Sequence, residues 1–416
     1  MERILVSRQP IFNADVREIG YELLYSGNAD DHAECSHGSG TAEAILNTSE
    51  ISLEELVGDR LAFINVDRDL IISKHCESLP KDRVVLEIVD AIDLDDALLR
   101  RLRELKGLGY RISVGSSIGS KQFEQLLATA HFVRFDVTGI AWTAIESSMA
   151  SVRNLPLQLI AERVETREQF EHCKTLEFDY FQGQFFCEPL LVAGKPVSVS
   201  RPALKMIGTL NDPQIKINEV EKAISRDARL TYKLLRYANS AMFGLQRPVE
   251  SIKFAIELIG LEKIRIWASL LLLYGFADKP RAIITTGAIR ARMCEQLAKA
   301  QGSPNSDKHF LVGLFSILDA IVDQPLGAAL ATLPLSAVLV DAILQQKGEL
   351  GEVLKCVLAY ERRDWAGAHS GVKLSRETIQ QAYVDAVGWS LRTLNEFSFT
   401  AENTSRKADK TSSHMG

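Results

Sequence analysis

Carboxylate and amide side chains recur in or directly after short apolar runs in the first half of the sequence. Such runs lead to Glu22 in "GYELLYS", Asn65 in "LAFINVD" and Glu87 in "VVLEIVD". The other members of the set are Asp90, Arg134, Asp136, Glu162, Glu165 and Gln182. Oxygen ligands of this kind suit Mg²⁺ or Mn²⁺, and two such ions can activate a water and hold a phosphodiester for attack. Any one of these residues alone would more commonly cap a helix or pair with an arginine, but the ordered set predicts phosphodiester chemistry.

These residues need a scaffold that brings the ends of separate strands together. About eight short β-rich runs occur in the first half, with amphipathic helical stretches such as "DALLRRLRELKGLG" between most of them. Repeated strand–helix units indicate a parallel sheet covered by helices. About eight units favour a closed (β/α) barrel, in which chemistry is located at the C-terminal ends of the strands.

The segment "GYRISVGSSIGS" interrupts the pattern of polar strand ends. Its first part is typical of a buried strand, and its second part of a loop. The strand ends on Gly115 and Ser116, and the loop that follows has no acid, base or metal ligand. The middle of the expected site therefore has no side chain that could bind a metal ion or transfer a proton.

Residues 1–192 resemble an EAL domain, the barrel that hydrolyses cyclic di-GMP in bacteria. The stretches that carry the resemblance are "RQPIF", "YELLYS", "FINVD", "LEIVD", "AERVET" and "FDYFQGQFFCEPL". The resemblance implies that Glu22, Asn65 and Glu87 are at metal-ligand positions. It implies that Asp90 is at the position that supports the dimerising loop.

Four departures from the EAL pattern fall on the same end of the expected barrel. "ISVGSSIGS" matches the family's ALDDFGTG, so Gly115 and Ser116 replace the two aspartates that bridge the metals. Ser26 replaces an arginine that would pair with a substrate phosphate, Arg134 replaces a lysine, and Arg163 replaces the glycine of AEGVE. Two metal ions need bridging negative charge, and arginine is poorly suited to the proton chemistry of lysine. We therefore expect no hydrolysis, and at most weak binding of Mg²⁺, Mn²⁺ or cyclic di-GMP.

The strand signals fade after "CEPLLVAGKPVSVSRPALK", and helical spacing of apolar residues dominates from residue 193. "DARLTYKLLRYANSAMFG" and "SIKFAIELIG" are amphipathic, whereas "IRIWASLLLLYGF" is apolar around most of its circumference and is expected to be a buried central helix. We expect a helical domain over 193–399. The polar stretch 400–416 is expected to be a disordered tail.

This second half resembles an HDOD domain, the noncatalytic helical relative of HD-type metal phosphohydrolases. The resemblance rests on "SRDARLTYKLLRYANSAMFG", with Asn239 and Ser240, and on "VESIKFAIELIGLEKIR". The His-Asp pair of HD hydrolases falls on Ser316 and Ile317, so no metal site is expected. His309 is expected on the surface or in a loop. Asn239 and Ser240 either bind a ligand or, as we favour, end a helix by satisfying its backbone groups.

Composition excludes several function classes. The chain has 416 residues, 46% hydrophobic and 25% charged, with a net charge of −6. The negative charge argues against nucleic-acid binding as the main role, and no apolar run reaches the roughly 20 residues of a membrane span. Six scattered cysteines without a CxxC pair indicate neither a zinc site nor a disulfide framework. These features and the lack of a signal peptide favour the reducing cytoplasm.

The two resemblances together indicate a bacterial EAL–HDOD signalling protein. The function we favour is a noncatalytic regulator that acts through protein contacts, with the helical half as the main partner-binding surface. The resemblance implies a cyclic di-GMP-linked behaviour such as motility, biofilm formation or surface attachment. The alternatives are a cyclic di-GMP receptor with the barrel as sensor and, third, a residual phosphodiesterase.

Overall fold

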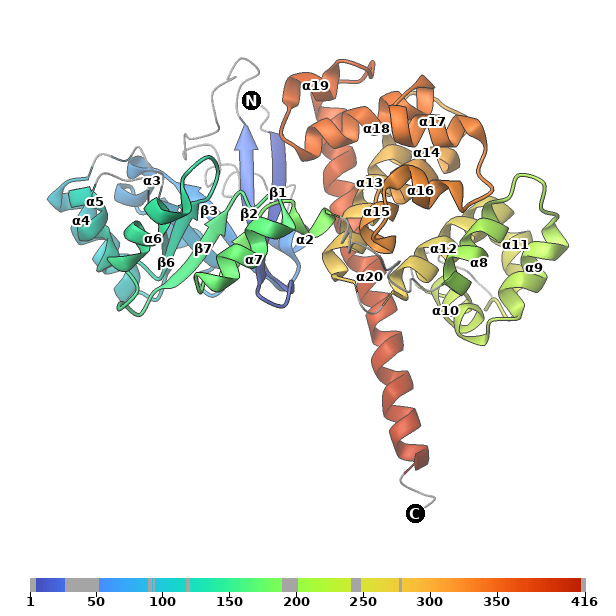
Figure 1. Cartoon of the computed structure of the whole chain (residues 1–416), viewed down its shortest axis with the longest axis horizontal. Helices are drawn as coiled ribbons and strands as arrows, with labels where there is room; N and C mark the ends of the chain where they lie inside the picture. Colours follow the sequence, from blue (N-terminus) through green and yellow to red (C-terminus); the bar gives the residue numbers. More distant parts are fainter. Residues whose placement is uncertain are drawn as a thin grey trace. The chain divides into compact units, whose positions relative to one another are not determined.

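The chain forms two compact units, Met1–Glu188 and Pro189–Gly416 (Figure 1). The computed structural model describes residues 5–26, 52–88, 92, 94–116, 120–188, 201–240, 248–276 and 279–412. The first unit contains all the strands of the described chain, and the second is helical. The predicted combination of a barrel followed by a helical domain is thus confirmed.

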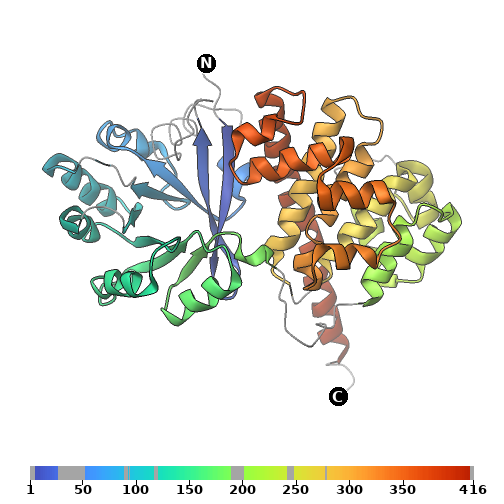
Figure 2. The same ribbon diagram turned by 45° about the horizontal axis from the view of Figure 1, so that its top comes forward.

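Eight strands close into a barrel in chain order (Figure 2). They are β1 (Leu5–Asn13), β2 (Glu18–Ser26), β3 (Leu61–Val66), β4 (Val84–Ile88), β5 (Arg111–Gly115), β6 (Phe132–Asp136), β7 (Gln158–Glu162) and β8 (Tyr180–Gln182). The helices of this unit are α2 (Leu53–Val57), α3 (Arg68–Ile72), α4 (Asp96–Gly107), α5 (Ser120–Leu127), α6 (Trp142–Ala150) and α7 (Arg167–Thr175), with the short 3₁₀ turns η1 (His75–Ser78) and η2 (Phe185–Cys187). We call the end of the barrel at the carboxyl ends of β2–β8 the mouth.

Strand β1 departs from the all-parallel arrangement that the sequence predicts. It pairs antiparallel with both β2 and β8, whereas β2 to β8 are parallel. Only residues 14–17 join β1 to β2, and the Asn13 side chain accepts hydrogen bonds from the backbone of Asp15 and Arg17 in this turn. A turn this short can form a hairpin but cannot cross over to a parallel neighbour.

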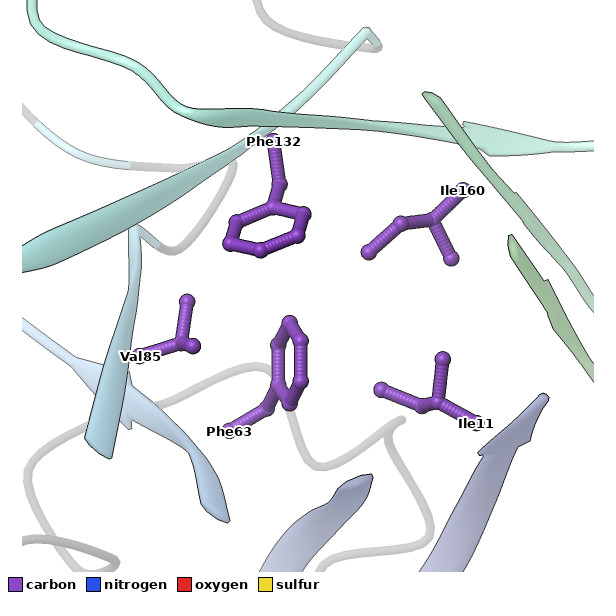
Figure 3. Packing of buried hydrophobic residues seen from close by; sticks show 5 residues of the cluster. All are labelled: Ile11, Phe63, Val85, Phe132 and Ile160. Atoms are coloured by element: carbon purple, nitrogen blue, oxygen red, sulfur yellow. The ribbon is translucent and has the colours of Figure 1, made fainter. Parts of the chain in front are cut away.

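One apolar layer fills the barrel below the mouth. It consists of Ile11, Phe63, Val85, Phe132 and Ile160, which point toward one another (Figure 3). The Phe63 and Phe132 rings meet edge to face with centroids 5.4 Å apart. Alternate residues of a strand face the same side. The side chains two positions nearer the mouth on these five strands are Gln9, Asn65, Glu87, Arg134 and Glu162. The apolar layer therefore positions a polar layer directly above it.

The helical unit is built around α13 (Arg281–Ala300), which packs against α14 (Ser306–Phe315), α18 (Gly348–Glu361) and α20 (Arg376–Ser412). Helix α12 (Leu261–Tyr274) is buried over much of its surface, as its apolar sequence predicts. The remaining helices are α8 (Arg201–Asn211), α9 (Ile217–Ser225), α10 (Ala228–Ala238), α11 (Ile252–Ile259), α15 (Leu318–Val322), α16 (Leu326–Ala331), α17 (Ala337–Gln345) and α19 (Trp365–His369). Gly313 allows α14 to approach α13 closely, since a Cβ there would lie 2.6 Å from the backbone of Ala291.

The C-terminal segment differs from the disordered tail that its polarity predicts. Helix α20 continues from Arg376 to Ser412. The segment 389–412 contains no glycine or proline, and several of its residues are good helix formers. A helix that is already nucleated by packing can extend through such a segment at little cost. Composition alone misses this effect because it ignores the packed first turns of α20.

Candidate functional site

Glu22 is the centre of a hydrogen-bonded network at the mouth. Its Oε2 accepts a hydrogen bond from Gln182 Nε2 at 2.6 Å, and its Oε1 accepts one from Asn65 Nδ2 at 3.3 Å. Gln182 Nε2 also donates to Gln9 Oε1 at 3.1 Å. The antiparallel pairing of β1 and β2 sets Gln9 opposite Glu22. Sequence reasoning missed Gln9, whose only signal is its place in "RQPIF".

Arg134 lies among the acids of the neighbouring strands. Its Nε is 3.3 Å from Glu87 Oε1, and its Nη1 donates to Glu162 Oε1 at 3.0 Å. Its Nη2 donates to the Ile88 carbonyl at 3.2 Å. The Arg134 side chain is 10% exposed and that of Glu87 only 1%. The guanidinium thus supplies positive charge between two carboxylates of the layer in which the EAL resemblance places metal-ligand positions.

Glu87 is fully buried among the other charged groups of this layer. Burial raises the pKa of its carboxyl well above the ordinary range, Arg134 lowers it, and the neighbouring Glu22 and Glu162 raise it further. Its second oxygen, Oε2, is buried without a hydrogen-bond partner among the described residues. Glu87 therefore depends on Arg134 for most of the compensation that its buried charge needs.

Strand β5 contributes no charge to the mouth. Gly115 ends the strand, and the backbone N–H of Ser116 donates to the Arg134 carbonyl at 2.8 Å. The Ser113 hydroxyl faces the interior, fully buried, and has no hydrogen-bond partner in the described part of the chain. The gap predicted from "GYRISVGSSIGS" thus lies between Glu87 on β4 and Arg134 on β6.

A second cation lies at the rim of the mouth. Arg163 Nη1 is 3.3 Å from Asp136 Oδ2, and about half of the Arg163 side chain is exposed. Arg163 has a φ of 57°, a left-handed conformation that favours the glycine it replaces in the EAL pattern. The Glu165 side chain is exposed, and its backbone N–H donates to Gln169 at the start of α7. Glu165 is therefore at the edge of the site.

Two predicted positions remain, Ser26 and Asp90. Ser26 is the last residue of β2. Asp90 lies outside the described residues. The structure therefore brings together Glu22, Asn65, Glu87, Arg134, Glu162 and Gln182, with Asp136 and Arg163 at the rim.

The residues present do not fit a pair of divalent metal ions. Gly115 and Ser116 have no carboxylate to place between two ions, and the Arg134 guanidinium adds a positive charge within hydrogen-bonding distance of Glu162. Among the described residues, no three His, Cys, Asp or Glu side chains are arranged to hold a metal ion.

In the helical unit, Asn239 closes the loop that follows α10. Its Nδ2 donates to the carbonyls of Leu235 and Val249 at 2.9 and 2.8 Å, and its Oδ1 accepts from the Val249 N–H at 2.6 Å. The Ser240 N–H donates to the Tyr237 carbonyl. The Asn239 amide therefore satisfies backbone groups at the end of a helix, the role that we favoured from the sequence.

An arginine–glutamate pair lies next to Ser316, one of the two residues that the HDOD resemblance matches to the His-Asp pair of HD hydrolases. Arg290 makes a bidentate pair with Glu361 at 2.7 and 2.8 Å, and its Nη1 donates to Ser316 Oγ at 3.2 Å. Ile317 next to it is buried. His309 is fully buried in α14, so its predicted surface position is wrong; it lies on the side of α14 that packs into the core.

Comparison with protein-family models matches residues 68–189 to the EAL domain and residues 198–322 to the HDOD domain. The chain is an EAL–HDOD protein. The EAL match begins after β3, so Glu22 and Asn65 precede it, whereas Glu87, Arg134 and Gln182 lie within it.

Two relatives of this EAL–HDOD protein align over nearly its whole length. The uncharacterized protein YuxH of Bacillus subtilis is 28% identical over 93% of this chain and 98% of its own. The cyclic di-GMP phosphodiesterase CdgJ of Vibrio cholerae is 27% identical over 92% of both chains.

Likenesses to solved structures are weaker. A crystal structure of an EAL domain protein from Listeria monocytogenes is 22% identical, with a TM-score of 0.35, over 44% of this chain and 87% of that one. A putative phosphohydrolase from Shewanella amazonensis is 15% identical, with a TM-score of 0.37, over 49% and 95%. At these scores they add no argument to the fold described above.

The relative from Vibrio corrects one prediction from the sequence. We predicted that the chain is not an enzyme, and a protein similar over its full length is named a phosphodiesterase. The prediction took four departures from the EAL pattern at the mouth as sufficient to exclude activity. The comparison also links both domains to cyclic di-GMP signalling.

No helix in the described part of the chain is long and apolar enough to cross a membrane.

Proposed function

We propose that this EAL–HDOD protein binds cyclic di-GMP at the mouth of its barrel and passes the signal on through protein contacts of its helical domain. The proposal is supported by the polar layer around Arg134, in which a buried cation and the hydrogen-bonded Glu22 network lie within one end of the barrel. Arg163 adds a half-exposed cation at the rim. Arginine guanidinium groups are suited to the phosphates of a dinucleotide.

The binding step is tested by calorimetry with cyclic di-GMP on the full chain, with and without a chelator. Arg134 and Arg163 supply positive charge at the mouth, so binding is expected in EDTA and is expected to weaken as salt is added. Arg163→Gln should weaken it about tenfold, the value of one charge-assisted hydrogen bond to a phosphate. Lys347→Gln, which removes an exposed charge in the helical unit, serves as the matched control. Absence of heat at millimolar nucleotide would contradict the proposal.

A second candidate function is hydrolysis of cyclic di-GMP, which the name of the Vibrio relative favours. In this chain Glu22, Asn65 and Glu87 are the residues that could hold a single Mg²⁺ or Mn²⁺ ion, weakly because Arg134 is close to Glu87. Product formation is measured by chromatography with each metal. Turnover that Glu22→Ala abolishes would support hydrolysis, whereas turnover unchanged by this substitution would assign the activity to a contaminant.

A further inference from the structure

We propose that the exposed face of α10 in the helical domain is a docking surface for an acidic helix of a partner protein. The inference rests on the proposed function, since it names the surface through which the helical domain contacts its partner. Its starting point is the spacing of Arg229, Tyr232, Lys233 and Arg236. Residues at i, i+3, i+4 and i+7 lie on one face of a helix.

The opposite side of α10 is already used by the core. Leu230, Leu234, Tyr237 and Ala238 are buried there. Arg229 and Arg236 are exposed, and the Tyr232 side chain is exposed by 56%. In the described part of the unit α10 contacts α9, α11, α12 and α20 (Figure 1), and Arg229, Tyr232 and Arg236 remain exposed.

The positive charge of this face is not neutralised by ion pairs. Arg229, Lys233 and Arg236 form no ion pair with a carboxylate among the described residues, whereas several other cations of the same unit do. Asp227 accepts the N–H groups of Arg229 and Leu230 as the cap of α10. Glu396 on α20 interacts electrostatically with Arg236, and burial raises the pKa of the Glu396 carboxyl.

The charge continues onto the neighbouring helices. Lys233 Nζ is 6.0 Å from the centre of the Tyr274 ring at the end of α12, and the guanidinium of Arg281 on α13 is 5.8 Å from the same ring. The surface therefore combines tyrosine rings with cations, and Tyr and Arg are enriched among the residues that dominate binding energies. We call these six residues, from Arg229 to Arg281, the α10 surface.

Charge complementarity determines the occupant that we assign. The chain as a whole has a net charge of −6, so a basic surface on it is a local feature. A basic strip along about two helical turns matches a partner helix with carboxylates at the same spacing. A nucleic acid is disfavoured, because the net negative charge of the chain would repel a long polyanion.

The test measures binding of a fluorescent helical peptide to the full chain by anisotropy. The peptide carries Glu at i, i+3, i+4 and i+7 with Leu on the adjoining stripe, and its control has Gln in place of each Glu. We expect the Glu peptide to bind at least tenfold more tightly than the Gln peptide. We also expect binding to weaken several-fold between low and physiological salt.

Three variants locate the peptide. Arg229→Glu with Arg236→Glu should weaken binding at least tenfold, and Tyr232→Ala about fivefold. Lys347→Glu with Arg362→Glu, which makes the same charge change at the two exposed residues that flank α18, should leave affinity within twofold. Arg229→Gln with Arg236→Gln replaces the reversal variant if the latter loses its helical circular dichroism.

Equal binding of the Glu and Gln peptides, or equal loss in both charge-reversal pairs, would overturn the proposal. So would a single-stranded DNA oligomer that binds more tightly than the peptide and is released by the Arg229/Arg236 change. Cyclic di-GMP calorimetry on the same variants separates the two claims. Retained nucleotide binding with lost peptide binding supports both, and peptide binding without nucleotide binding contradicts only the barrel part of the proposed function.

Discussion

Arg134 is the residue on which the polar layer of the barrel depends. It is 10% exposed and contacts Glu87 and Glu162 from different strands. Arg134→Met should lower the free energy of unfolding of the barrel by about 3–5 kcal/mol, because it leaves buried carboxylates without a partner. Arg134→Lys keeps the charge but loses the forked geometry, so it should cost less. Urea denaturation of both variants checks this order, and equal stability of Met and wild type would contradict it.

Arg163 is strained by its backbone conformation. A left-handed φ costs a non-glycine residue about 1–2 kcal/mol. Glycine at this position would remove the cost, but the greater conformational entropy of glycine in the unfolded chain would offset part of the gain. Arg163→Gly should therefore raise the free energy of unfolding by about 0.5–1 kcal/mol. Arg163→Ala keeps the strain and loses the exposed pair with Asp136, so it should be neutral or slightly destabilising. Thermal denaturation of the two variants compares them, and a less stable glycine variant would refute the strain argument.

His309 links stability to pH. Its ring is buried in α14, with Nδ1 3.1 Å from the Asn305 carbonyl, and burial lowers its pKa. Below a pH of about 6.5, the ordinary pKa of histidine, His309 of the unfolded chain takes up a proton. The buried ring of the folded chain stays neutral until the pH falls further, so protonation favours unfolding. The contribution of His309 to stability should be constant above that pH and should be lost as the pH drops from about 6.5 toward the lowered value. His309→Gln should flatten this dependence in urea titrations at several pH values, and an unchanged slope would exclude His309 as the cause.

At the scale of elements, the packed part of α20 differs from its extension. Leu394 and Phe397 are buried, and the Phe397 ring contacts Tyr237 and Tyr274. Among the side chains that the structure describes, Phe397 is the last of α20 in the core. A chain that stops after residue 398 should melt within about 3 °C of the full chain, since no described core side chain is removed. A chain that stops after residue 387 loses Trp389 as well and should unfold. Equal melting of both truncations would contradict this division.

Elements also show which parts of the fold the sequence could predict. Short apolar, β-rich runs predicted the strands and the order of Glu22, Asn65 and Glu87 along the mouth, since parallel strands end on one side. The antiparallel β1 depends on a turn that has no room for a helix, and the network role of Gln9 follows from that pairing. The burial of His309 follows from the packing of α14 against several helices, among them α13 and α18, which the sequence of α14 alone does not reveal.

At the scale of the whole molecule, each of the two domains contains an arginine that is paired with glutamate near residues that the sequence resemblances match to metal-site positions. Arg134 pairs with Glu87 and Glu162 in the barrel, and Arg290 pairs with Glu361 in the helical unit. The sequence shows that the end of β5 lacks acidic residues. It does not reveal the arginine–glutamate pairs, because each pair joins residues far apart along the chain. A buried arginine with two carboxylates keeps the geometry of a polar site without a bound ion.

The account is tested most directly by hydrogen exchange of the full chain with and without cyclic di-GMP in EDTA. Nucleotide bound at the mouth should slow exchange near the carboxyl ends of β4 and β6, where Glu87 and Arg134 lie, and directly after β7, where Arg163 lies. Exchange at the far end of the barrel, around the turn between β1 and β2, should be unchanged. Slower exchange confined to the helical unit, or no change at saturating nucleotide, would contradict the central claim.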